Sequence, residues 1–155
     1  MRVLIVADVH GNGDALAAAL AAEPTAGTVF CLGDGVREYE DAERENPRRT
    51  FRIVRGNCDF FAPDIPDSGL CDIGGHRVLY LHGHLCGVKQ DLFRAETEAR
   101  SRGADILLFG HTHRTYGEFH GGLYLFNPGS LGYDGLYGVA DIEPDSVRFE
   151  KRRLR

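Results

Sequence analysis

Five apolar runs of the sequence each end in residues that can bind a metal ion. These residues are Asp, Asn and His, whose oxygen and nitrogen donors suit Mn²⁺, Zn²⁺, Fe or Ni²⁺ better than Mg²⁺ or Ca²⁺, which prefer oxygen alone. One such group carries little weight, because a lone buried His is more often a core residue than a ligand. The ordered set of five predicts a transition-metal site, and its groups are Asp8-Val9-His10, Gly33-Asp34, Gly56-Asn57, His82-Gly83-His84 and Gly110-His111-Thr112-His113.

The spacing within two of these groups predicts a shared direction for their side chains. Asp8 and His10 are two residues apart, so in extended backbone both side chains point to the same side. His111 and His113 have the same relation. Each group also contains or adjoins a glycine, which lets the backbone turn sharply and approach a metal ion or a phosphate closely.

The elements that must position these residues are the strands and helices of an α/β fold. Apolar runs predict buried strands over 3–7, 28–32, 51–54, 78–81 and 106–109. Helices are expected over 14–23 and 89–102. The first two strands and the helix between them form a βαβ unit, which implies a partly parallel sheet. Ligands bind such sheets beyond the carboxyl ends of the strands, where all five groups lie.

The remaining segments show no linker, repeat or low-complexity stretch, so residues 1–155 are read as a single domain. The densely charged segment 37–49 has no clear apolar stripe and predicts a solvated helix or loop. Segment 61–69 is expected to be an irregular loop. Everything from 116 to 153 is expected to be strand and turn.

Charge and hydropathy exclude several classes of partner. The chain has 155 residues and a formal net charge of −5, which argues against an extended basic surface for nucleic acid but not against a small nucleotide. No apolar run approaches the ~20 residues that span a bilayer, and no signal-type segment follows the start, so a cytoplasmic location without membrane contact is expected. His76 and His120 are expected to be exposed and without function. The cysteines are expected to be reduced and mostly buried; they are Cys31, Cys58, Cys71 and Cys86.

As an ordered set, these motifs resemble the calcineurin-like metallophosphoesterase superfamily. Together with Gly56-Asn57-Cys58-Asp59 and Asn127-Pro128-Gly129-Ser130, they resemble its small, single-domain prokaryotic phosphodiesterase branch over nearly the whole chain. The resemblance implies a four-layer α/β/β/α sandwich of two mixed β-sheets flanked by helices. It also implies two divalent transition metal ions, with Mn²⁺ preferred and Ni²⁺, Zn²⁺ or Fe as alternatives.

The resemblance assigns seven residues to these two ions. The first ion would be bound by Asp8, His10, Asp34 and His113. The second would be bound by Asp34, Asn57, His82 and His111, with the Asp34 carboxylate bridging the two. A bridged pair ~3.5–4 Å apart activates a shared water and clamps phosphoryl oxygens. Two divalent cations against two carboxylates leave a formal positive charge, so this acidic protein can still bind an anion.

The sequence departs from the wider superfamily at two linked positions. Cys58 stands where many relatives have a His that assists the leaving group, and Arg37 stands where many have the Asp that orients it. A thiol is a poor general acid at neutral pH, so we expect either good leaving groups or another proton donor. His84 is the candidate donor, against the alternative of a supporting or merely exposed His. Asn12 is a candidate for binding a substrate phosphate, or only a helix cap.

The leading interpretation is a metal-dependent phosphodiesterase, in which a metal-activated water attacks phosphorus in line. The expected substrate is a small phosphodiester, with nucleotides among the candidates, and a homo-oligomer is compatible with the sequence. The alternatives are a phosphomonoesterase or protein phosphatase, and a non-catalytic protein-interaction scaffold on the same fold.

Overall fold

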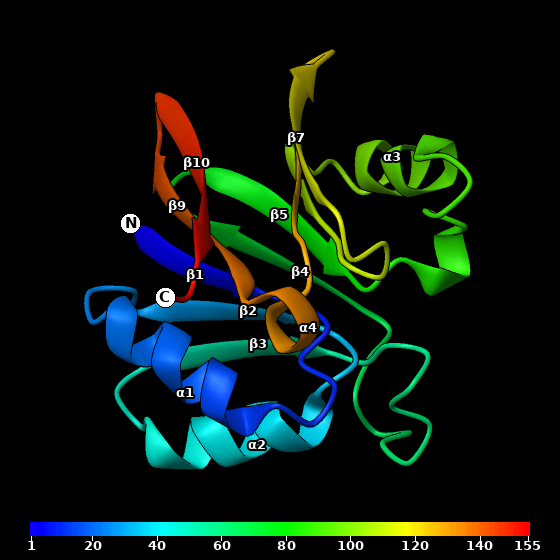
Figure 1. Ribbon diagram of the computed structural model, residues 1–155. Coiled ribbons are helices and arrows are strands. Elements are labelled where there is room, and N and C mark those ends of the chain that lie inside the picture. Colours follow the sequence, from blue (N-terminus) through cyan, green and yellow to red (C-terminus); the bar gives the residue numbers. More distant parts are fainter.

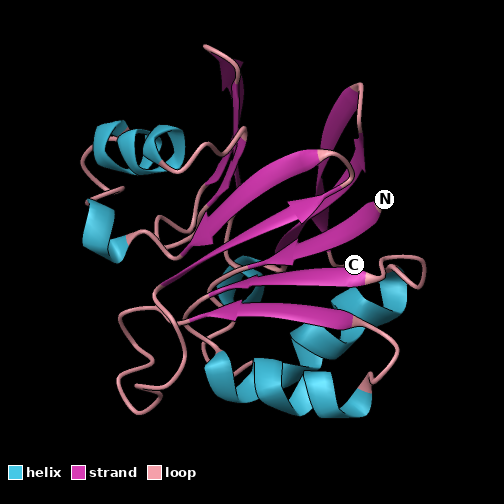
Figure 2. Ribbon diagram, turned by 180° about the vertical axis from the view of Figure 1, so that it is seen from behind, coloured by secondary structure: helices cyan, strands magenta, loops and turns pink.

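The computed structural model describes residues 1–155, and its strands form two mixed five-stranded sheets that pack face to face (Figure 1, Figure 2). The first sheet contains β1 (Arg2–Val6), β2 (Thr28–Leu32), β3 (Thr50–Val54), β9 (Leu136–Glu143) and β10 (Ser146–Arg153). Its order is β10-β9-β1-β2-β3, with β1, β2 and β3 parallel and β9 antiparallel to its neighbours.

The second sheet has a parallel centre and two antiparallel edge strands. It contains β4 (Ser68–Ile73), β5 (His76–Leu81), β6 (Ile106–Leu108), β7 (Thr115–His120) and β8 (Leu123–Pro128). Its order is β4-β5-β6-β8-β7, in which β5, β6 and β8 run parallel.

Helices cover the outer faces of both sheets. In Figure 1, α1 (Gly13–Ala22) and α2 (Val36–Glu45) lie against the first sheet, and α3 (Phe93–Ser101) lies against the second. Two single-turn elements, η1 (His84–Cys86) and α4 (Leu131–Asp134), follow β5 and β8. None of the helices is long and apolar enough to cross a lipid bilayer.

The hydrophobic core has three layers that alternate with the sheets. Along β1, Leu4 and Val6 pack toward α1 and α2, while Val3 and Ile5 pack into the space between the two sheets. A third cluster joins the outer face of the second sheet to α3 through residues such as Leu107. Because β1 is buried on both faces, its sequence is continuously apolar rather than alternating. The expected four-layer sandwich is confirmed.

The charged segment 37–49 differs from its expectation because it hides a narrow apolar stripe. It forms most of the helix α2, whose buried residues Val36, Tyr39 and Ala42 are three apart and face the sheet. The other side chains of α2 are charged and face solvent, which masks the stripe in the sequence. The alternative of a loop is therefore wrong.

Two further helix boundaries differ from the sequence expectation. The helix expected from residue 89 begins at Phe93, whose backbone N–H is capped by the Asp91 carboxylate at 3.0 Å. The segment from 116 onward is not strand and turn throughout, because α4 forms one helical turn there. Ser130 caps this turn by accepting the N–H of Tyr133, and Gly135 ends it with a φ of +66°.

Burial of some cysteines and of one histidine also differs from the expectation. Only Cys31 is buried, Cys71 and Cys86 are half-buried and Cys58 is exposed, so the expectation of mostly buried thiols is wrong. His76 is largely covered rather than exposed. Its Nδ1 lies 2.8 Å from an oxygen of Asp105 and its Nε2 lies 2.9 Å from the carbonyl of residue 143. This ring therefore links β5 of the second sheet to the end of β9 in the first.

Candidate metal centre

The residues after β1, β2, β3, β5 and β6 come together at one edge of the sandwich, as the parallel strands require. The first of two groups there joins Asp8, His10 and His113. The His113 Nε2 atom lies 3.2 Å from Asp8 Oδ1 and 3.3 Å from His10 Nε2. His10 Nε2 lies 3.7 Å from the same Asp8 oxygen. These three donor atoms therefore face one common point.

The second group surrounds the buried ring of His82. Its Nε2 atom lies 3.1 Å from Asn57 Oδ1, 3.1 Å from His111 Nδ1 and 3.3 Å from Asp34 Oδ2. The other ring nitrogen of His82 donates a hydrogen bond to the Leu32 carbonyl at 2.6 Å. This bond holds the proton of the neutral ring on Nδ1 and leaves Nε2 free to bind a metal ion.

Asp34 lies between the two groups. Its Oδ1 atom accepts the backbone N–H of Cys58 at 2.8 Å. Its Oδ2 atom lies 3.3 Å from His82 Nε2 in one group and 3.7 Å from His10 Nε2 in the other. The carboxylate is thus fixed through one oxygen and presents the other to both groups.

The donor atoms themselves indicate a metal site, because one of them is buried without a hydrogen-bond partner and others face each other closely. Asp8 Oδ1 is buried and accepts no hydrogen bond, which is costly for a carboxylate oxygen without a cation. Two imidazole nitrogens that face each other need a proton or a metal ion between them. Ligand bonds of about 2.1 Å place neighbouring donor atoms about 3.0–3.4 Å apart, close to the separations found here.

Burial and mutual charge shift the pKa values of these groups in opposite directions. Burial raises the pKa of Asp8 to about 7, with the Asp34 charge adding to it and His82 opposing it. Burial lowers the pKa of His82, but the hydrogen bond to Asp34 and the charge of Asp8 outweigh it, so the pKa is raised overall. Burial lowers the pKa of His111 to about 4. Without metal ions, protons on Asp8 and His82 therefore balance negative charge of the two carboxylates, and bound metal ions would take over this role.

Most of the seven expected ligands have left-handed backbone, which the sequence did not suggest. The expectation of extended backbone at 8–10 and 111–113 is wrong, and the side chains converge through these turns instead. Such φ values are uncommon outside glycine and concentrate at functional sites. They are +54° at Asp8, +47° at His10, +53° at Asp34, +68° at His111 and +58° at His113.

Asp59 connects the loops that carry Asp34 and Asn57, a role that sequence reasoning missed. Its carboxylate is 3% exposed. One oxygen accepts the N–H groups of Asp34 and Gly56, both at 2.7 Å. The other accepts two N–H groups at the start of α2, at 3.1 and 3.2 Å. The close fit also requires Gly56, since a Cβ there would lie 2.1 Å from Asp34 Oδ1.

The turn after β8 supports the loops of Asp8 and His111. The buried Ser130 hydroxyl donates to the Asp8 carbonyl at 2.9 Å, and the Gly132 N–H donates to the same carbonyl at 3.0 Å. The Asn127 amide donates to the Gly110 carbonyl at 3.0 Å. These bonds show that the Asn127-Pro128-Gly129-Ser130 motif and the turn after it support the backbone of Asp8 and of Gly110, next to His111. No single residue of Asn127-Pro128-Gly129-Ser130 indicated this supporting role in the sequence; only the complete motif did.

His84 and Cys58 lie beside the two groups of donors. The His84 ring lies 5.4 Å from that of His82 between centroids, and its pKa is lowered by burial and by the charge of His82. The Cys58 sulfur lies with donor atoms of His10 and Asp34, all within 4.8 Å of one another. Burial and the nearby Asp34 raise the pKa of this thiol.

Asn12 has both ends of its side chain in use. Its Oδ1 atom accepts the N–H of Ala15 at 3.1 Å, which caps α1. Its Nδ2 atom donates to the Gly132 carbonyl at 3.1 Å. The structure therefore shows the helix cap, and contact with a substrate phosphate stays a prediction.

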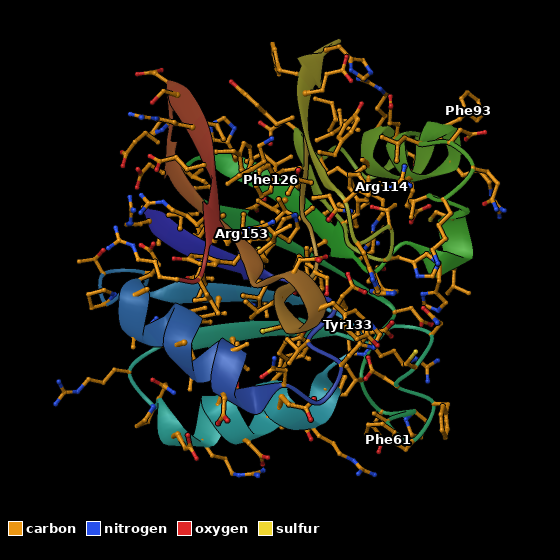
Figure 3. The ribbon with its side chains drawn as sticks, viewed as in Figure 1. Phe61, Phe93, Arg114, Phe126, Tyr133 and Arg153 are labelled. Atoms are coloured by element: carbon orange, nitrogen blue, oxygen red, sulfur yellow. The ribbon has the colours of Figure 1, made fainter.

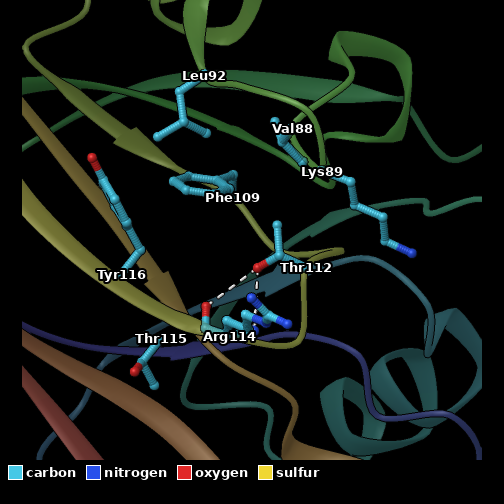
Figure 4. A pocket seen from close by; sticks show the side chains of 8 residues that line it. All are labelled: Val88, Lys89, Leu92, Phe109, Thr112, Arg114, Thr115 and Tyr116. Carbon is cyan, nitrogen blue, oxygen red and sulfur yellow. Dashed lines mark hydrogen bonds between the residues drawn. The ribbon is translucent and has the colours of Figure 1, made fainter.

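A cavity of about 570 Å³ adjoins the centre on the side of Thr112. Figure 4 shows Leu92, Phe109 and Tyr116 around its apolar end and the cationic side chains of Lys89 and Arg114 toward its other end. The charge of Lys89 contributes to the lowered pKa values of His111 and His113 and partly opposes the raised pKa of Asp8. This cavity therefore offers positive charge beside the donor set.

Several known proteins are similar to this chain in sequence or in fold. A family model described as the calcineurin-like phosphoesterase superfamily domain matches residues 1–143. The probable metallophosphoesterase YsnB of Bacillus subtilis is 35% identical in an alignment that covers 96% of this chain and 90% of that protein. The phosphodiesterase YfcE of Escherichia coli K12 is 29% identical in an alignment that covers 95% of this chain and 91% of that protein. The structure of Vps29 from Chaetomium thermophilum aligns with a TM-score of 0.85 at 20% identity, covering all of this chain and 88% of that one. This chain belongs to the calcineurin-like phosphoesterase superfamily.

Proposed function

We propose that the protein hydrolyses phosphodiester bonds at a centre for two divalent transition metal ions. The observation that carries this proposal is the position of Asp34 Oδ2, within 3.3 Å of one group of donors and 3.7 Å of the other. The family supports a phosphoesterase, and the relative YfcE is named a phosphodiesterase.

The seven donors divide into two sets that share one carboxylate. Asp8, His10 and His113 would bind one ion, and Asn57, His82 and His111 would bind the other, with Asp34 common to both. When bound, such ions activate a water and neutralise the phosphoryl oxygens. Mixed nitrogen and oxygen ligands favour Mn²⁺, with Zn²⁺, Fe or Ni²⁺ as alternatives.

The protein's own residues orient the diester and serve the leaving group. Lys89 and Arg114 offer positive charge to the anionic substrate. Hydrolysis forms a bond from a water oxygen to phosphorus, breaks one ester bond and passes a proton to the departing alcohol. The lowered pKa of His84 keeps its ring neutral at pH 7, so it would assist by donating a hydrogen bond from a ring N–H. The Cys58 thiol stays protonated and contributes little acid catalysis.

The test compares a diester with its monoester. Manganese-loaded protein should hydrolyse bis(p-nitrophenyl) phosphate with a higher kcat/KM than p-nitrophenyl phosphate. A chelator should abolish the activity, and Mn²⁺ should restore it best among common divalent ions. A monoester kcat/KM tenfold above the diester value would move the assignment to a phosphomonoesterase.

A non-catalytic scaffold is the competing proposal, because Vps29 shares this fold. A scaffold has no need for a complete set of donors, whereas all seven expected positions here carry residues of types that can bind a metal ion, and their donor atoms lie close together. Chelator-sensitive hydrolysis of the diester separates the two, and metal content does not, because a Vps29 has been solved in complex with Zn²⁺.

A further inference from the structure

A second cavity, of about 360 Å³, opens directly onto the metal centre and has an unexplained aromatic wall. His10 and Asp34 belong both to this cavity and to the proposed ligand set. Its lining also includes Arg37, Glu38, Phe60 and Phe61. A group bound in this cavity would therefore be close enough to the metal centre to belong to the same substrate molecule as the reacting phosphate.

The two phenylalanines leave large apolar surfaces in water. Phe60 is 84% exposed and Phe61 is 43% exposed, and their rings meet edge to face with centroids 6.0 Å apart. The buried carboxylate of Asp59 fixes the residue just before them, and the Ala62 N–H closes a turn by donating to the Asp59 carbonyl at 3.0 Å. The rings are thus held at the cavity by anchored backbone.

Arg37 adds a cation to this aromatic wall. Its guanidinium carbon lies 4.3 Å from the centroid of the Phe61 ring, a cation–π arrangement. The guanidinium forms no ion pair with a carboxylate of the chain, so its planar set of N–H donors is available to a ligand.

We propose that this cavity binds a nucleobase of the substrate, stacked on Phe60 and approached by Arg37, which makes the substrate a nucleotide phosphodiester. This inference rests on the proposed function. Aromatic side chains bind bases through their π-faces, and arginine adds hydrogen bonds and cation–π contact. The volume lies near the lower end of ligand cavities, about 300–1,000 Å³, and suits one base. The net charge of −5 favours a short nucleotide over a long polyanion.

The kinetic test changes only the base. Manganese-loaded protein is given the dinucleotide thymidylyl-thymidine and the same diester with hydrogen in place of both thymines. We expect kcat/KM for the intact dinucleotide to be about tenfold higher, since stacking on one aromatic ring is worth about 1–3 kcal/mol per base. Phe60→Ala should bring this ratio close to one, and Phe60→Trp should retain it.

A matched control uses Phe93, which is 74% exposed and lies on α3, well away from Phe61 (Figure 3). Phe93→Ala should leave the ratio unchanged. Because Phe60 and Phe93 are both exposed, we expect neither substitution to shift the thermal unfolding midpoint measurably.

Binding provides a readout that does not depend on turnover. Thymidine 5′-monophosphate is titrated into zinc-loaded protein and followed by proton NMR. Stacking on Phe60 should move the thymine methyl signal upfield, and Phe60→Ala should remove this shift while Phe93→Ala retains it.

The outcomes separate this inference from the proposed function. A ratio near one in the wild type, or a ratio that Phe60→Ala leaves unchanged, would overturn the nucleobase site and leave the two rings as a surface for a protein partner. Failure to hydrolyse any diester would instead overturn the proposed function, and the NMR titration would then decide separately whether the cavity binds a base.

Discussion

Replacing Asp59 by asparagine removes half of the acceptors that hold the metal-binding loops together. The carboxylate accepts four backbone N–H groups, two on each oxygen, at 2.7 to 3.2 Å. An amide has one acceptor oxygen, so its NH₂ group would face two N–H donors in either orientation. Each buried N–H left without a partner costs about 1–3 kcal/mol, which predicts a loss of about 2–6 kcal/mol in the free energy of unfolding.

The assay is urea unfolding of chelator-treated protein, which measures stability without a contribution from metal binding. Asp64→Asn is the matched control, because Asp64 is exposed in the same loop and undergoes the same chemical change. Metal titration of the folded protein is the second measurement. Loosening the loops of Asp34 and Asn57 should weaken metal affinity by about 10–100-fold. If the free energy of unfolding of Asp59→Asn is within about 0.5 kcal/mol of the wild-type value, the role assigned to this carboxylate is refuted, since a surface substitution ordinarily has an effect of that size.

Three further predictions concern the pH dependence of the centre, its backbone support and its acid chemistry. Metal affinity should fall by about tenfold in all as the pH falls from about 8 to 6, because Asp8 has a pKa of about 7 and its proton must leave before a metal ion binds; the raised pKa of His82 adds to this fall. A dissociation constant that is flat across this range in a metal titration would contradict it. Gly132→Ala should lower the free energy of unfolding by about 1–3 kcal/mol in urea, because a Cβ there would lie 2.0 Å from the carbonyl oxygen of Val9; unchanged stability would show that α4 moves freely. Cys58→His should flatten the dependence of rate on leaving-group pKa across a series of aryl phosphodiesters, with a rate gain of about tenfold, or about 1.4 kcal/mol of barrier, for the most basic leaving group. Identical slopes in the two proteins would show that protonation of the leaving group does not limit the rate.

The sequence predicted which donor residues lie together, because local signals marked each of them. Apolar runs such as Val3–Ala7 mark buried strands, and topology brings the carboxyl ends of parallel strands to one edge. Asp34 and His82 are therefore brought together although they are far apart in the chain, and the structure places their donor atoms 3.3 Å apart.

The residues that the sequence did not reveal act through long-range or backbone contacts. Asp59 accepts N–H groups 25 positions away, and Ser130 donates to a carbonyl 122 positions away. No local pattern specifies such pairs. The left-handed backbone of Asp8 and His10 was equally hidden, because this conformation is uncommon outside glycine and the enrichment of Asp and His in it does not mark single positions. The burial of His76 was also hidden, since its partners Asp105 and the carbonyl of residue 143 are 29 and 67 positions away in the sequence.

Metal content of the wild type and of Asp34→Asn tests the central claim most directly. If Asp34 bridges two ions, the manganese-loaded wild type should hold two equivalents per chain by elemental analysis after removal of free metal. Asp34→Asn should lose both together and should have no measurable turnover, because the shared negative charge is gone. Asp64→Asn should match the wild type. Two ions retained at full occupancy in Asp34→Asn, or no more than one in the wild type, would contradict the account.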